Sequence, residues 1–83
     1  MKNAKITVYS TPACPYCVMA KDYLKSKNID FIEIDVSKDE KQAEIMVEKS
    51  GQMGVPVIII NNQNKEDIVL GFDKDKINKI LNI

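Results

Sequence analysis

Residues 5–17 read KITVYSTPACPYC and include both cysteines of this 83-residue chain. From Lys5 to Ser10 apolar and polar residues alternate around Ile6 and Val8, which predicts a strand, and the following TPA segment predicts a loop. A helix is expected to begin at the cysteines, because Pro15 suits the first helical turn, where its missing N–H costs no hydrogen bond. The sequence therefore places a C-x-x-C pair where a strand passes through a loop into a helix.

Strands and helices continue to alternate along the rest of the chain. The cysteine helix closes at 25–28, and we expect then a strand over 31–34, a helix from about Ser37 to Ser50, a strand over 57–60, a turn over 61–64, a strand over 68–70 and a helix capped by Asp73. The first strand–helix–strand unit indicates a right-handed crossover between parallel strands, and the apolar run at 57–60 indicates a central strand. We therefore expect one α/β domain over residues 1–83, ordered β-α-β-α-β-β-α, with a four-stranded mixed sheet flanked by three helices.

Single residues predict helix ends and buried faces. Ser37 stands three residues before Glu40, which is the spacing of a capping box, and Gly51 suits the C-terminal end of that helix. The apolar faces are expected to contain Cys17, Ala20 and Leu24 in the first helix, Ala43, Met46 and Val47 in the second, and Ile77, Ile80 and Leu81 in the third. Core or half-buried positions are also expected for Tyr9, Tyr23, Phe31 and the four methionines.

Charge and hydropathy exclude several classes of function. Twelve basic and twelve acidic residues give a formal net charge of zero, so nothing indicates a nucleic acid or an anionic membrane as partner. The N-terminal stretch is too short and too polar for a signal peptide, and no segment approaches the roughly 20 apolar residues that span a bilayer. We expect a cytoplasmic monomer, and in a reducing cytosol paired cysteines tend to cycle or to bind metal.

The spacing of the cysteines favours chemistry over structural cross-linking. A disulfide across so short a loop stabilises by only ~2 kcal/mol in the chain-entropy model, against ~4.7 kcal/mol for a loop of about 100 residues. Tetrahedral zinc needs four ligands, whereas this chain has two cysteines and no histidine, so carboxylates or a second chain would have to complete the site. A redox-active dithiol is the interpretation that fits the pair best, and a metal module remains the alternative.

The two thiols are expected to have different roles. Disulfide exchange uses the thiolate, and Cys14 lies at the start of a predicted helix, where free N–H groups and the helix dipole favour negative charge. Cys17 lies one turn further along the same helix, within disulfide reach. We assign Cys14 as the nucleophile and Cys17 as the resolving thiol that releases the reduced substrate.

Three segments resemble the glutaredoxin family: residues 8–17, 54–56 and 71–75. The resemblance extends over nearly the whole chain and implies a thioredoxin-like fold, with an enzyme that reduces protein disulfides or glutathione mixed disulfides. It also implies a cis peptide bond between Val55 and Pro56, with the Val55 backbone pairing to the bound substrate. No tightly bound cofactor is implied, and glutathione would be a co-substrate. Some relatives hold an iron–sulfur cluster between two chains. In the second form of the metal alternative, Cys14 of two chains would do the same together with glutathione or other thiols.

The family's substrate and glutathione contacts can be carried onto individual positions of this chain. They fall on Thr11, Pro15, Tyr16, Val55, Pro56, Gly71, Phe72, Asp73 and Asp75. Two of these positions depart from the family pattern, because Thr11 stands where a basic residue is usual and Phe72 replaces the second glycine of a Gly-Gly pair. A missing charge-assisted hydrogen bond is worth ~1.5 to 3 kcal/mol, so weak glutathione binding is expected.

The departures also leave the electron donor open. The Gly71-Phe72 pair resembles redoxins that serve ribonucleotide reductase and are recharged by thioredoxin reductase, whereas Pro15 and Tyr16 between the cysteines are typical of glutaredoxins. The expected partners are disulfide-containing proteins, with ribonucleotide reductase or a peroxidase as candidates. The expected reductant is either glutathione or thioredoxin reductase.

Overall fold

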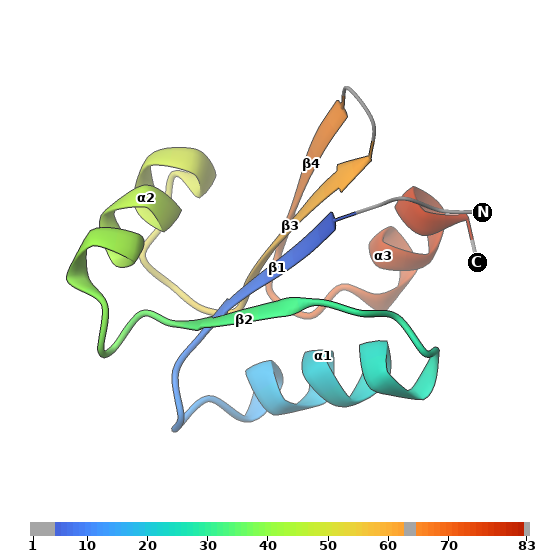
Figure 1. Ribbon diagram of the computed structural model, residues 1–83, viewed down its shortest axis with the longest axis horizontal. Coiled ribbons are helices and arrows are strands. Elements are labelled where there is room, and N and C mark those ends of the chain that lie inside the picture. Colours follow the sequence, from blue (N-terminus) through green and yellow to red (C-terminus); the bar gives the residue numbers. More distant parts are fainter. Residues whose placement is uncertain (1–4, 63–64, 83) are drawn as a thin grey trace.

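The computed structural model describes residues 5–62 and 65–82, and its elements follow the predicted order (Figure 1). They are β1 (Lys5–Ser10), α1 (Pro15–Ser26), β2 (Ile32–Asp35), α2 (Glu40–Ser50), β3 (Val57–Asn62), β4 (Lys65–Leu70) and α3 (Lys74–Leu81). The predicted turn over 61–64 was wrong at Asn61 and Asn62, which belong to β3, and residues 63–64 lie outside the described residues. None of the helices in the described ranges is long and apolar enough to cross a membrane.

The four strands form one mixed sheet in the order β2-β1-β3-β4. β1 is parallel to β2 and antiparallel to β3, and β3 is antiparallel to β4. β3 is a central strand as predicted, because Val57 to Ile60 are all buried. The parallel β1–β2 pair is joined by α1, so the end of β1 lies next to the start of the helix that carries the cysteines (Figure 1).

Two apolar clusters cover the two faces of the sheet. One joins α1 and α3 to the sheet through Ala20, Leu24, Ile77 and Leu81, which pack with residues of β1, β3 and β4. The other joins α2 to the opposite face and contains Tyr9, Met46, Val57 and Ile59. Figure 1 shows this division, with α1 and α3 on one side of the strands and α2 on the other. The cysteines therefore belong to the layer formed by α1 and α3.

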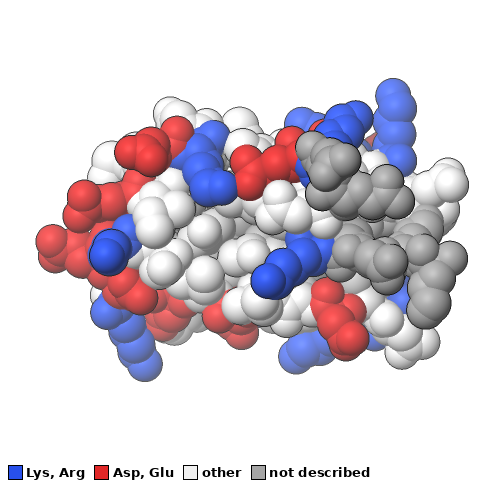
Figure 2. Space-filling model, turned by 45° about the horizontal axis from the view of Figure 1, so that its top comes forward, with Lys and Arg blue, Asp and Glu red and all other residues white. Residues whose placement is uncertain are grey.

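Charged side chains of both signs are interspersed over the surface. In Figure 2, lysines and acidic residues alternate across one face, and acidic side chains gather at the left end, where α2 lies. No single-sign patch dominates this face, which agrees with the zero net charge.

Some local predictions were wrong. Ser37 does not cap α2: Asp39 is the N-cap and accepts the N–H of Gln42, while Ser37 bonds to Asp35. Val47, expected in the core, is exposed. β2 begins one residue later than predicted and β4 three residues earlier. Among the methionines Met46 is buried, whereas Met19 and Met53 are exposed.

Candidate active site

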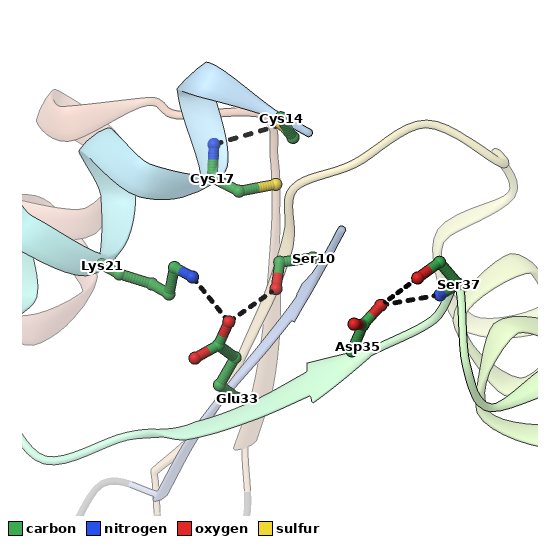
Figure 3. Close-up of polar contacts among 7 residues, drawn as sticks. All are labelled: Ser10, Cys14, Cys17, Lys21, Glu33, Asp35 and Ser37. Carbon is green, nitrogen blue, oxygen red and sulfur yellow. Dashed lines mark hydrogen bonds and ion pairs between the residues drawn. The ribbon is translucent and has the colours of Figure 1, made fainter. Parts of the chain in front are cut away.

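Cys14 is the N-cap of α1, and its side chain closes the first turn of the helix. Its backbone is extended, with φ −96° and ψ 109°, and its Sγ accepts the backbone N–H of Cys17 at 3.2 Å. Pro15 occupies the start of the helix, as predicted. Both cysteines carry free thiols, and Figure 3 shows the bond from the Cys17 backbone to the Cys14 sulfur. An N–H group and the positive end of the helix dipole therefore face the sulfur.

The Cys14 sulfur also meets the segment before β3. Its thiol donates to the backbone oxygen of Val55 at 3.7 Å. The peptide bond between Val55 and Pro56 is cis, which confirms the expectation drawn from the resemblance. Two segments 41 residues apart in the sequence are thus joined at the sulfur atom.

Cys17 is in a different environment from Cys14. Its side chain is 0% exposed, whereas Cys14 is half-buried. Burial, together with the hydrogen bond to Cys14, raises the pKa of the Cys17 thiol to about 11. The backbone of Thr11 and the charge of Lys21 act in the opposite direction. The structure therefore separates one accessible sulfur at a helix end from one sequestered thiol.

A backbone hydrogen bond joins the cis-proline segment to the turn before α3. The N–H of Gly71 donates to the carbonyl oxygen of Pro56 at 2.8 Å, and Gly71 has φ +75°. That left-handed conformation favours glycine over residues with a Cβ. Thr11 is likewise tied to the site by its backbone, because its carbonyl accepts the N–H of Cys14 at 3.3 Å.

Phe72 is part of the packing between α1 and α3. Its ring lies 5.9 Å from that of Tyr23 at an interplanar angle of 58°, and it packs against the larger apolar cluster. Lys27 and Lys74 lie over the same tyrosine ring, with Nζ 5.8 and 5.5 Å from its centroid. Tyr23 also donates a hydrogen bond to Asn78 of α3. Phe72 thus has a packing role between α1 and α3 that does not depend on a bound ligand.

The remaining predicted contact residues lie in two places, beside the cysteines and at the start of α3. Tyr16 is 61% exposed beside the cysteines. Met53, which no sequence motif indicated as part of the site, is 82% exposed just before the cis-proline segment. Asp73 caps α3 by accepting the N–H of Lys76 at 3.1 Å. Asp73 and Asp75 line an open hollow of about 810 Å³ between β4 and α3. The contacts of Cys14 therefore reach Thr11, Cys17 and Val55, whereas the hydrogen bond of Asp73 stays within α3.

One polar cluster near the cysteines has no counterpart in the sequence analysis. Lys21 Nζ donates to Glu33 Oε2 at 2.5 Å, and the hydroxyl of Ser10 donates to the same oxygen at 3.2 Å (Figure 3). Ser10 ends β1 and Glu33 lies in β2, so the parallel pairing brings them together. The hydrogen bond from Lys21, together with its charge, lowers the pKa of the Glu33 carboxyl below its usual range.

Within residues 5–62 and 65–82, no group of three or more His, Cys, Asp or Glu side chains could hold a metal ion. A metal bound to Cys14 would accordingly need further ligands from outside this set of residues.

The fold and the site define a class of protein. A cysteine pair at the start of the helix after β1, opposite a cis-proline before β3, on a sheet ordered β2-β1-β3-β4, is the arrangement of a thioredoxin-like redox protein. The model of the Glutaredoxin family matches residues 6–64. The chain belongs to the glutaredoxin family, and it is a thiol–disulfide oxidoreductase.

Relatives and solved structures agree with this assignment. The chain is 49% identical over 76 residues to an uncharacterized glutaredoxin-like 8.6 kDa protein in the rubredoxin operon of Clostridium pasteurianum, covering 92% of this chain and 96% of that one. It is 36% identical over 61 residues to glutaredoxin 3 of Escherichia coli, covering 74% of each. The solved structure of the glutaredoxin-like protein NrdH-redoxin from Escherichia coli superposes with a TM-score of 0.76 at 28% identity, covering 92% of this chain and 93% of that one.

Proposed function

We propose that the chain reduces protein disulfides or glutathione mixed disulfides through a dithiol cycle in which Cys14 is the nucleophile and Cys17 the resolving thiol. It acts in the cytoplasm as a single domain over residues 1–83. The observation that carries the proposal is the contrast between the two sulfurs. Cys14 is partly accessible and receives an N–H at the start of α1, whereas Cys17 is fully buried with a raised pKa.

The cycle consists of two exchange steps with balanced electrons. In the first, the Cys14 thiolate attacks one sulfur of the substrate disulfide, a Cys14–substrate bond forms, and the other substrate sulfur leaves as a thiolate. In the second, Cys17 attacks Cys14, the bond to the substrate breaks, and the substrate leaves as its second thiol. Two electrons pass from the dithiol to the substrate, and a Cys14–Cys17 disulfide remains for the reductant.

The substrate is proposed to lie across the cysteine motif and the cis-proline segment. In the free protein the Val55 oxygen accepts the Cys14 thiol, so a substrate that engages the sulfur meets this backbone next. The proposed contact residues are Thr11, Pro15, Tyr16, Val55, Pro56, Gly71, Phe72, Asp73 and Asp75. Among these, Tyr16 offers an exposed aromatic ring beside the sulfurs.

The reductant is proposed to be glutathione or thioredoxin reductase. Family membership supports glutathione, since the matched family is Glutaredoxin. Thr11 and Phe72 support thioredoxin reductase, because one lacks a charge for glutathione and the other is engaged with Tyr23. The structural neighbour NrdH-redoxin is described as having a thioredoxin-like activity profile. Ribonucleotide reductase or a peroxidase remains the proposed client.

Two variants test the roles of the cysteines. Cys14→Ser is expected to abolish turnover of a disulfide substrate, because the attacking sulfur is lost. Cys17→Ser is expected to accumulate a mixed disulfide with the substrate, visible by mass spectrometry of the intact protein, or to keep only glutathione-dependent activity. Wild-type turnover in the Cys14→Ser protein would overturn the assignment.

The reductant is tested by following NADPH consumption with the oxidised protein in two parallel assays. One contains glutathione and glutathione reductase, and the other contains thioredoxin reductase alone. Turnover confined to one assay identifies the donor. Failure of both assays, with a competent control redoxin in each, would contradict both proposed donors.

A further inference from the structure

Lys21 is held on the inner side of α1, close to the resolving thiol. It follows Cys17 by four residues, so the two side chains lie on the same face of the helix, one turn apart. Its side chain is only 19% exposed although it carries a charge. The carboxylate of Glu33 holds its ammonium group, and the 1% exposed Ser10 hydroxyl holds the same carboxylate oxygen. Figure 3 shows the three side chains converging between α1 and the sheet.

The second exchange step requires a negative charge on the Cys17 sulfur, and burial disfavours that charge. Cys17 must lose its proton before it attacks Cys14, and its side chain has no contact with solvent. When the substrate is bound, the Cys14 sulfur is part of a disulfide and carries no charge. The groups that face Cys17 are Cys14 and Lys21 on α1, the Thr11 backbone and, through Lys21, Glu33 of β2. Lys21 is the cation of this set.

We infer that Lys21, held in place by Glu33 and Ser10, stabilises the Cys17 thiolate during release of the substrate. The inference rests on the proposed role of Cys17 as the resolving thiol. The Cys17 thiol gives up its proton, its sulfur forms the bond to Cys14, and the Cys14–substrate bond breaks. The departing substrate thiolate then takes up a proton. Lys21 keeps its own proton throughout and acts only through its charge, as a positioning residue for the anion.

The size of the expected effect follows from the thiolate population. A rise of one pKa unit reduces the thiolate fraction about tenfold, but the more basic thiolate is a better nucleophile, which restores about threefold. Loss of the Lys21 charge is therefore expected to slow substrate release about threefold to tenfold at pH 7. Because the effect acts on the thiolate fraction, the pH profile of the release rate should have the same shape in the variant as in the wild type but be shifted to higher pH.

The test measures each exchange step separately. The mixed disulfide of Cys14 with a small chromogenic thiol is prepared in Lys21→Gln, Lys21→Arg and wild-type proteins, and thiol release is followed by stopped flow between pH 6 and 10. Lys25→Gln is the matched control, because Lys25 lies one turn further along α1 and is exposed. Formation of the mixed disulfide is measured in the Cys17→Ser background, with and without Lys21→Gln.

The expected result is slower release in Lys21→Gln, with release restored by Lys21→Arg and unchanged in Lys25→Gln. Equal release in Lys21→Gln and the wild type would overturn the inference, as would equal slowing by Lys25→Gln. Equal slowing of mixed-disulfide formation and release by Lys21→Gln would mean that the Lys21 charge acts on Cys14, and it would also overturn the inference. If wild-type protein releases no thiol although Cys17 is present, it is the proposed resolving role of Cys17 that fails.

Discussion

The carbonyl oxygen of Pro56 accepts the backbone N–H of Gly71 at 2.8 Å, so the cis-proline segment and the turn before α3 are fixed to each other. Gly71 reaches this position with φ +75°. A Cβ at this residue would find open space, so backbone conformation alone restricts the choice of side chain.

Gly71→Ala is therefore expected to lower the free energy of unfolding by about 1 kcal/mol, since alanine is strained at positive φ. Urea unfolding of the variant and the wild type measures the difference. Gly54→Ala is the matched control, because a Cβ there meets only the Gln52 side chain at 3.7 Å and the backbone φ is not in the left-handed range. Equal losses in both variants would contradict the argument from conformation.

The raised pKa of Cys17 predicts a loss of stability at alkaline pH. The unfolded thiol ionises near the ordinary value of 9.0, whereas the folded thiol does so at about 11. Between these values the folded protein retains a proton that the unfolded chain has lost, so stability falls as the pH rises, by about 2 kcal/mol at pH 11. The measurement compares urea unfolding of the reduced wild type with Cys17→Ala from pH 8 to 11. A constant difference between the two proteins across this range would refute the prediction.

The ion pair between Lys21 and Glu33 predicts the opposite dependence at acid pH. The Glu33 pKa is lowered, first by the hydrogen bond from Lys21, so the stabilisation is present above the usual glutamate range and is lost as the pH falls through the lowered value. Glu33 is half exposed, so solvent screening limits the pair to about 0.2 to 1 kcal/mol. Glu33→Gln should be less stable than the wild type at pH 7 and equally stable in strong acid. The exposed Glu44→Gln serves as control and should match the wild type at both.

Purified protein is expected to be a colourless monomer whose count of free thiols falls from two to zero on oxidation. Cys14 and Cys17 are both free thiols in the structure, so both are available for titration. Visible absorption, analytical ultracentrifugation and thiol titration check the three parts. A brown dimer that loses its colour in Cys14→Ser would establish the iron–sulfur alternative instead.

The order of the elements and the position of the cysteines could be predicted because they depend on local patterns. Alternation around Val8, the apolar run that ends at Ile60 and the spacing of Cys17, Ala20 and Leu24 each have one simple structural solution, and the structure adopts it. The cis bond at Pro56 came from family resemblance, since local sequence favours trans at most X-Pro bonds.

The errors arose where two local interactions compete or where distant segments meet. Ser37 could cap a helix, but the carboxylate of Asp35 accepts both its N–H and its hydroxyl, at 2.9 and 2.5 Å, and leaves the cap to Asp39. The strand β4 begins with charged residues, so its first half carries no apolar signal. The group of Ser10, Lys21 and Glu33 depends on strand pairing and helix packing together, and no spacing in the sequence indicates it.

The two apolar clusters share no residue, although both rest on the same sheet. The helix α2 lies on the face away from the cysteines, so a label can be attached to it without contacting the thiols. A fluorophore or an affinity tag attached at the exposed Glu44 would sit across the sheet from the thiols. The labelled protein would carry its label on the α2 layer and exchange electrons at the cysteines of the layer formed by α1 and α3.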